Sequence, residues 1–213
     1  IGHENSEVNT ILLCLDITEE VVDKAIKGKV DLIISHHPFI FSGLKRITSE
    51  TVHGRKMLKI IENKIAVYSG HTNVDFGING LNDYIFYKLD LNGKVEIYNE
   101  FEYEDYNFIK QRNQHVKGGT VRIKVLDYEM ELLDLIEVIK EKLGLDFVRY
   151  VGENRKIRKI GLVTGGGSSF MHSVKENIDV FLTGDLRYHE ALDTLEEGGI
   201  LIDIGHYESE YLF

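Results

Sequence analysis

Histidines and carboxylates that could bind metal ions follow three short apolar runs of the sequence. The first group is the adjacent pair His36 and His37, which comes after the apolar residues 30–34. Pro38 ends that run because it has no N–H to donate. Neighbouring side chains on an extended backbone point to opposite sides, so the pair suits two targets, such as two metal ions bound side by side. The alternative is that one histidine packs in the core and the other faces water.

The second group is His71 and Asp75, which lie four residues apart after the apolar residues 65–69. In one interpretation Asp75 is a carboxylate ligand, and His71 is either a further ligand or a hydrogen-bonding partner of one. In the other, Gly70 and Asn73 form a turn that caps the following helix. The residues themselves leave both interpretations open.

The third group is His206 and Glu210, again four residues apart, after the largely apolar residues 201–204. If the chain is helical from Tyr207, this spacing places both side chains on one face, and Glu208 is turned away from them. If the chain is extended, Glu208 lies on the same side as the other two. Imidazole nitrogen and carboxylate oxygen together suit zinc, iron, manganese or nickel.

Together the three groups supply a donor set for two divalent metal ions with positions left for water. The predicted ligands are three imidazoles and two carboxylates: His36, His37, Asp75, His206 and Glu210. We therefore expect a metal-dependent hydrolase that acts on a small nucleotide-like or phosphorylated molecule through metal-activated water. The alternative is a non-catalytic metal-binding scaffold, store or chaperone that acts through protein partners.

Other polar residues could serve the chemistry around such a site. Tyr188 and His189 follow a further apolar run and, like His71, could transfer protons. The glycine-rich residues 165–169 lie between a predicted strand and a predicted helix. They either form a tight turn or present N–H groups to a phosphate, although they lack the ending of a P-loop.

The elements that must position these residues alternate along most of the chain. Strands are predicted at residues 9–16, 30–34, 65–69, 119–126, 147–151, 159–164, 179–182 and 201–204. Helices are predicted at residues 19–27, 51–63, 79–88, 131–142 and 186–196. Residues 100–114 are rich in acidic and aromatic side chains without clear periodicity.

This alternation predicts an α/β fold made of two similar α/β lobes. Each lobe is expected to hold a mixed, largely parallel sheet flanked by helices, and the two lobes to face a shared dinuclear metal site. We expect an N-terminal lobe at residues 1–98 and a second lobe at residues 99–213, which contributes the C-terminal ligands.

Composition narrows the possible partners and compartment. The formal net charge of −10 argues against a non-specific nucleic-acid binder, which needs a basic face. The apolar runs are far shorter than a membrane span, and no signal peptide is visible. The lone cysteine, Cys14, lies in an apolar run and is expected to be a core residue rather than part of a disulfide. We therefore expect a cytoplasmic protein with no membrane partner.

The sequence resembles the YbgI-type dinuclear-metal proteins, also called the NGG-one-interacting-factor-three-like family or GTP cyclohydrolase type 2 homologues. The matching motifs run in family order over nearly the whole chain: Leu15-Asp16-Ile17-Thr18, Ser35-His36-His37-Pro38, His71-Thr72-Asn73-Val74-Asp75, residues 165–169, Leu182-Thr183-Gly184-Asp185 with His189, and Gly205-His206-Tyr207-Glu208-Ser209-Glu210. The resemblance places the family's metal ligands on the same five residues. It places His71 and His189 near that site.

The resemblance also implies an assembly and two departures. Members of the family form hexameric rings built from dimers, so a homo-oligomer is expected. The stretch from residue 75 to residue 165 is too short for the extra domain that some members carry. The family's N-terminal helix is mostly missing here, and its C-terminal helix is cut short at Phe213.

Overall fold

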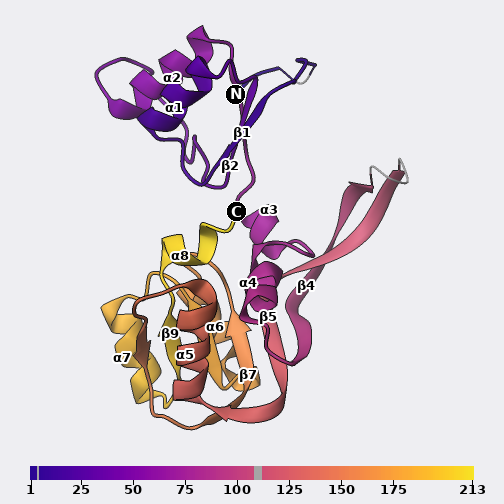
Figure 1. The fold of residues 1–213 in the computed structure, drawn as a ribbon, viewed down its shortest axis with the longest axis vertical. Coiled ribbons are helices and arrows are strands. Elements are labelled where there is room, and N and C mark those ends of the chain that lie inside the picture. The colour runs from indigo at the N-terminus through magenta and orange to yellow at the C-terminus, as the bar shows by residue number, and fades with distance from the viewer. Residues whose placement is uncertain (4, 108–111) are drawn as a thin grey trace. The chain divides into compact units, whose positions relative to one another are not determined.

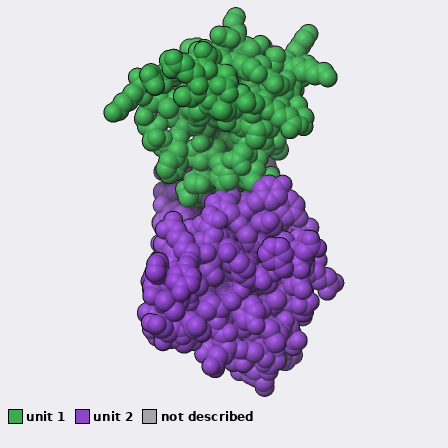
Figure 2. All heavy atoms as spheres, turned by 90° about the vertical axis from the view of Figure 1, so that its left-hand side faces the viewer, with its two compact units in different colours: residues 1–74, 213 green, residues 75–212 purple. Residues whose placement is uncertain are grey.

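The computed structural model describes residues 1–3, 5–107 and 112–213, which form two compact units (Figures 1 and 2). Unit 1 comprises Ile1–Val74 with Phe213, and unit 2 comprises Asp75–Leu212. The division therefore lies before helix α4 (Leu81–Leu89), and not after residue 98 as the sequence pattern led us to expect. The physical reason is that Ile85 and Leu89 of this helix are fully buried in the core of unit 2.

Unit 1 is a parallel three-stranded sheet with two amphipathic helices. The strands are β1 (Ile11–Cys14), β2 (Leu32–Ser35) and β3 (Ala66–Ser69), in the order β1-β2-β3. The helices are α1 (Glu19–Lys27) and α2 (Val52–Glu62), whose buried faces join the sheet in one core: Val22, Ala25, Ile33, Met57, Ile60 and Val67. Cys14 packs at the edge of this core and is only partly buried.

Both helices of unit 1 begin at a threonine that satisfies a backbone N–H of the first turn. The Thr18 side chain accepts a hydrogen bond from the N–H of Val21 at 3.1 Å, and the Thr51 side chain accepts one from Gly54 at 3.0 Å. Glu19 and Glu20 place negative charge at the start of α1, where the helix dipole favours it. The predicted N-terminus of α1 at residue 19 is confirmed.

Unit 2 contains a mixed six-stranded sheet in the order β4-β5-β7-β8-β9-β6. Its strands are β4 (Gly93–Asn107), β5 (Arg112–Glu131), β6 (Arg149–Val151), β7 (Lys156–Leu162), β8 (Val180–Thr183) and β9 (Leu201–Asp203). Strands β7, β8 and β9 pair in parallel, and the other pairs are antiparallel. The parallel part therefore brings the carboxyl ends of β7, β8 and β9 to one edge of the sheet.

The central part of the sheet of unit 2, at β7 and β8, is buried on both faces. On one face Leu182 and Ile160 pack with α4 and with α5 (Leu132–Leu143). On the other face Phe181 packs against α6 (Met171–Val174). The remaining short elements are α3 (Thr72–Phe76), the 3₁₀ turns at Ser168–Phe170 and Lys175–Asn177, α7 (Tyr188–Glu196) and α8 (His206–Glu210). Within the described ranges, no helix is both long and apolar enough to cross a membrane.

A long antiparallel hairpin is the element that the sequence did not predict in full. Strands β4 and β5 pair from Gly93 opposite Leu126 to Asn107 opposite Arg112, whereas only residues 119–126 were predicted as a strand. Residues 108–111 lie outside the described residues. The outer part of the hairpin extends away from the sheet (Figure 1). Glutamates and aromatic residues alternate there only over the short stretch 100–104, and both Glu100 and Phe101 are exposed, so this alternation marks no buried face.

Candidate metal centre

Three histidines of unit 1 gather where strands β2 and β3 end. His36 and His37 follow β2, His71 follows β3, and each offers a ring nitrogen within 4.8 Å of the others. The ring centroid of His36 lies 5.2 Å from that of His37 and 5.4 Å from that of His71. His36 is fully buried, and the other two are half-buried. His71, which the sequence offered as a ligand or a proton donor, therefore belongs to the same cluster as the histidine pair.

Hydrogen bonds fix the rings of the adjacent pair. Nδ1 of His36 lies 2.9 Å from the carbonyl oxygen of Gly70, and Nδ1 of His37 lies 2.8 Å from Oδ1 of Asp16. A carbonyl or carboxylate oxygen only accepts hydrogen bonds, so each Nδ1 carries the proton and donates it. In a neutral ring, Nε2 then has the lone pair that a metal ion would bind.

The pairing of β1 with β2 explains why Asp16 meets His37. The register places Cys14 opposite Ser35, and the pairing continues beyond both strands because the N–H of His37 donates to the carbonyl of Leu15 at 3.0 Å. Asp16 lies two residues beyond Cys14, and His37 lies two residues beyond Ser35, so Asp16 is level with His37. No role was predicted for Asp16, although Asp16 and His37 both lie two positions beyond the ends of neighbouring parallel strands.

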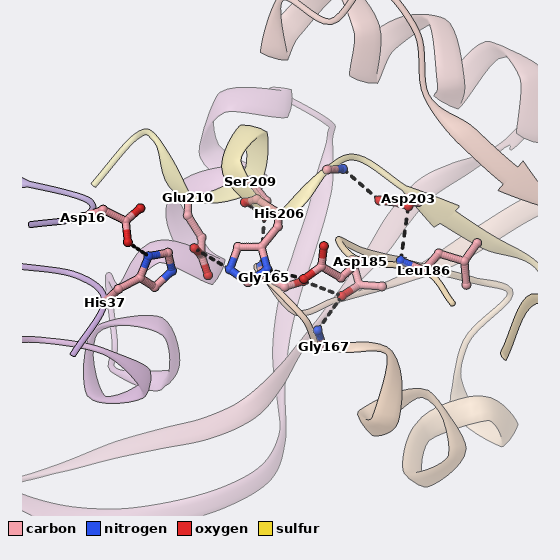
Figure 3. A network of polar contacts seen from close by, with 12 residues as sticks. Asp16, His37, Gly165, Gly167, Asp185, Leu186, Asp203, His206, Ser209 and Glu210 are labelled. Carbon is pink, nitrogen blue, oxygen red and sulfur yellow. Dashed lines mark hydrogen bonds and ion pairs between the residues drawn. The ribbon is translucent and has the colours of Figure 1, made fainter. Parts of the chain in front are cut away.

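His206 and Glu210 meet on helix α8 of unit 2 (Figure 3). Nε2 of His206 lies 3.0 Å from Oε2 of Glu210, and the Glu210 side chain is almost completely buried. The chain is helical from His206 to Glu210, so the extended alternative is excluded. Nδ1 of His206 lies 2.6 Å from Oδ2 of Asp185, which fixes this ring as Asp16 fixes that of His37.

The two carboxylates around His206 make this position attractive for a cation. Burial by itself would lower the pKa of His206, but the hydrogen bond to Asp185 and the negative charges of Glu210 and Asp185 outweigh it. The pKa of His206 therefore lies above its ordinary value. The carboxylates of Asp185 and Glu210, which favour the charged form of His206, would also favour a divalent cation at this position.

Asp203 bonds to the turn after β8 and to the turn after β9, and these two turns place Asp185 beside His206. The register pairs Thr183 with Asp203, so Asp185 falls level with Gly205. Oδ1 of Asp203 accepts a hydrogen bond from the N–H of Gly205 at 2.9 Å, and Oδ2 accepts one from that of Leu186 at 3.2 Å. The contact between Asp203 and Leu186 is visible in Figure 3. Sequence reasoning missed Asp185 and Asp203 as well, and the parallel pairing of β8 with β9 is the signal that locates both.

The glycine-rich residues 165–169 form a tight turn against α8. The N–H of Gly165 donates to Oγ of Ser209 at 2.9 Å, and the N–H of Gly167 donates to Oγ1 of Thr183 at 2.9 Å. The carbonyl of Gly165 accepts a hydrogen bond from the N–H of Gly184 at 2.8 Å. These internal bonds favour the interpretation as a tight turn over the interpretation as a phosphate cradle.

Three candidate residues remain: Asp75, Tyr188 and His189. Asp75 is buried in α3. Tyr188 and His189 begin α7, where both side chains are exposed and their rings meet edge to face at 5.3 Å. Within the described part of the chain, neither of these two residues forms a hydrogen bond with Asp185 or Glu210. Their assignment as proton donors stays a prediction.

The Duf34/NIF3 (NGG1p interacting factor 3) family model matches residues 1–213. A Clostridium perfringens protein named GTP cyclohydrolase 1 type 2 homolog is 36% identical over 213 residues, which cover 99% of this chain and 77% of that protein. A Schizosaccharomyces pombe protein named NIF3 homolog is 32% identical over 209 residues, covering 96% of this chain and 72% of the relative.

Solved structures show the same fold. The crystal structure of the Staphylococcus aureus hypothetical protein SA1388 matches with a TM-score of 0.82 and 34% identity, over 98% of this chain and 78% of that one. The ybgI protein matches with a TM-score of 0.74 and 19% identity, over 98% of this chain and 77% of that one, which is a likeness of fold alone. The histidine and carboxylate groups thus lie in a known fold, and the chain belongs to the Duf34/NIF3 family.

Proposed function

We propose that this protein binds two divalent metal ions and is a metal-dependent hydrolase of small nucleotide-like or phosphorylated molecules. The proposed ligands are the five that the sequence predicts: His36, His37, Asp75, His206 and Glu210. The observation that carries the proposal is shared by all three of these histidines. Each one presents Nδ1 to an oxygen atom: the Gly70 carbonyl for His36, Asp16 for His37 and Asp185 for His206.

This pattern is the one that metal-binding histidines show in proteins. Such a histidine nearly always donates its other ring N–H to a carboxylate or a backbone carbonyl, which fixes the ring and raises its basicity. Two exposed aspartates, Asp16 and Asp185, are held against the histidines in this way. Imidazole and carboxylate donors suit zinc, iron, manganese or nickel, so the donor set fits a divalent transition metal without selecting one.

Two bound ions would supply Lewis-acid charge that lowers the pKa of water and stabilises negative charge in a hydrolytic transition state. The protein's own groups would orient the ligands and move protons. His71 lies within reach of the histidine pair and is the first candidate for a proton carrier. Tyr188 and His189 are the other candidates. No described residue is seen to select a guanine ring, so the reaction named for the relatives is not carried over.

A non-catalytic metal-binding scaffold is the second candidate function. It is favoured by the family description, which refers to an interaction with another protein. In either case we expect a cytoplasmic protein, because a lone cysteine fits a reducing compartment. By its resemblance to the family we also expect a homo-oligomer, and light scattering on the purified chain would measure its mass.

Elemental analysis tests the metal site. Protein purified without chelator, or reloaded with zinc, manganese, iron or nickel, should hold close to two ions per chain. His37→Gln should lower that ratio, whereas His172→Gln, at an exposed histidine of α6, should leave it unchanged. A wild-type chain that carries no metal and takes none up would overturn the proposal.

Substrate screening separates the two candidate functions. The metal-loaded protein would be incubated with phosphoesters, nucleotides and cyclic amides, and the products would be followed by mass spectrometry. Turnover that His37→Gln abolishes and His172→Gln preserves would support a hydrolase. Two tightly held ions with no turnover of any compound would favour the scaffold.

A further inference from the structure

A groove in unit 1 begins at Pro38, the residue directly after the histidine pair. It runs between the loop that follows β2 and the start of α2, and its volume is about 540 Å³. This volume lies within the range of roughly 300–1,000 Å³ that is usual for small-molecule sites. Its apolar lining includes Phe39, Leu44, Ile47 and Met57, and its polar lining includes Arg46 and His53. We call it the Phe39 groove.

The floor of the Phe39 groove belongs to the core of unit 1. Phe39 and Met57 are both buried in that core. The ring of His53 lies over Phe39 with 4.6 Å between centroids and 32° between planes. On the same ring, Nζ of Lys56 lies 5.4 Å from the centroid. Phe39 is therefore held in place by two side chains of α2, and the groove has a rigid aromatic floor.

A close backbone approach fixes the far end of the loop against α2. A Cβ atom at Gly54 would lie 1.9 Å from the carbonyl oxygen of Thr48, so only glycine allows the two segments to meet there. The N–H of Gly54 is also bound to the Thr51 side chain at 3.0 Å. The loop is thus anchored near both of its ends.

The rim of the groove leaves large apolar side chains in contact with water. Phe41 is 84% exposed, and Ile40, Leu44 and Ile47 are each more than 40% exposed. All four line the groove, so this is one contiguous patch and not scattered surface residues. A contiguous apolar patch around a concave site is typical of a ligand-binding surface.

The segment that lines the groove, residues 38–57, has a net positive charge, whereas the chain as a whole is negative. Residues 38–57 contain four basic residues and one acidic residue, in a chain whose formal net charge is −10. Arg55 pairs with Glu19, and Lys56 donates to the carbonyl of Ile17. Arg46 lines the groove, and within the part of the chain that the structure describes its guanidinium forms no ion pair or hydrogen bond. Arg46 can therefore meet an anion.

We propose that the Phe39 groove binds a small aromatic anion. The flat apolar ring would lie against the exposed rim residues Leu44 and Ile47. The anionic group would meet Arg46 and His53. Because the groove starts directly after His37, we assign it to recognition of the substrate, and this assignment rests on the proposed hydrolase function. Binding of the aromatic anion itself does not require the metal ions, so the two proposals can fail separately.

Two fluorescent probes of similar shape test the groove in the full chain, with and without metal. One is 1-anilinonaphthalene-8-sulfonate, an aromatic monoanion, and the other is N-phenyl-1-naphthylamine, which lacks the sulfonate. We expect saturable binding of the anion with one site per chain. Arg46→Gln should lower the affinity for the anionic probe about tenfold, since a hydrogen bond to a charged group is lost. The affinity for the neutral probe should change little. Ile47→Ser should weaken both probes.

Lys45→Gln is the matched control, because Lys45 neighbours Arg46 but does not line the groove. It should leave both affinities unchanged. If Lys45→Gln and Arg46→Gln lowered the affinity for the anionic probe equally, the probe would be attracted by positive charge in general, and the proposal would be overturned. Unchanged affinities for both probes in Ile47→Ser would also overturn the proposal, because the probes would then bind elsewhere. Circular dichroism and a metal ratio close to that of the wild type would show that each variant is folded.

Discussion

Gly165 leaves the space that the carboxylate of Glu210 occupies. A Cβ atom at Gly165 would lie 2.1 Å from Oε1 of Glu210 and 3.4 Å from Nε2 of His206. The backbone at this position has a φ of +62°, which L side chains rarely adopt. Gly165 therefore bears directly on the position of a proposed metal ligand, although it has no side chain of its own.

Gly165→Ala should lower the metal content and the stability together. The new methyl group must push the Glu210 carboxylate aside, and the left-handed backbone adds a strain of about 1–3 kcal/mol. Gly198→Ala is the matched control, because Gly198 has a φ of +70° with no atom within 4 Å of its Cβ position. We expect it to lower stability alone. Metal ratios and urea unfolding measure both effects, and an unchanged metal ratio in folded Gly165→Ala would contradict the explanation.

The charge of His206 should make the stability of the metal-free protein depend on pH. Its pKa is raised above the ordinary 6.5 because the hydrogen bond and charges of Asp185 and Glu210 outweigh burial. The charged ring therefore stabilises the folded state fully below about pH 6.5, and this contribution is lost as the pH rises through the raised pKa. Asp185→Asn keeps a hydrogen-bond acceptor but removes its charge.

We expect Asp185→Asn to lower the pKa of His206, as followed by an NMR titration of the ring protons of the apo protein. Its loss of stability should be greatest at low pH, where the wild-type ring is charged, and should shrink above the raised pKa. Urea unfolding at several pH values measures this. Identical titration curves for the wild type and the variant would show that Asp185 does not act on His206.

Arg122 should be the most destabilising polar position of the hairpin. Its guanidinium is fully buried and donates to Asp83 and to the carbonyls of Gly119 and Gly77. Arg122→Met would leave these acceptors without their donor, which typically costs about 3–5 kcal/mol for a buried ion pair. Lys117→Met is the control, because its ion pair with Glu100 is exposed and should contribute little. Chemical unfolding that ranks the two variants equally would contradict this role of burial.

The sequence predicted the elements whose pattern is local. The apolar runs that end at His36 and His206 became parallel strands, because buried strands of an α/β unit are continuous apolar segments. The hairpin of β4 and β5 was predicted only at its inner end, around Val121 and Ile123, where one face packs in the core. Further out, Glu100, Phe101 and Glu102 are all exposed, so their alternation marks no buried face and was not interpreted as a strand.

The site was predicted unevenly for a similar reason. The spacing of His206 and Glu210 predicts that both lie on one helical face, because four residues make about one helical turn. Asp16 and Asp185 act on histidines 21 residues away in the chain, and no local spacing reveals that. Their contacts follow from the register of neighbouring parallel strands, and the register is a property of the folded sheet. Gly165 was likewise recognisable as a turn, but not as the residue that makes room for Glu210.

The last prediction separates Glu210 from its neighbour Glu208. Glu210 is buried and faces His206. Glu208 points away from His206 and lies against Gly205, because a Cβ atom built at Gly205 would lie 2.0 Å from Oε2 of Glu208. Glu210→Gln should therefore remove at least one metal ion and any hydrolytic activity. Glu208→Gln should keep both.

A carboxylate-to-amide change alters charge but hardly alters size, so both variants should fold, and circular dichroism checks this. Because the two glutamates lie within one short helix, general changes in charge near α8 affect both variants alike. Any difference in their metal ratios must then come from the direction in which each side chain points. If Glu208→Gln empties the site while Glu210→Gln retains two ions, then Glu208 is the ligand and the contact between His206 and Glu210 is only a structural ion pair.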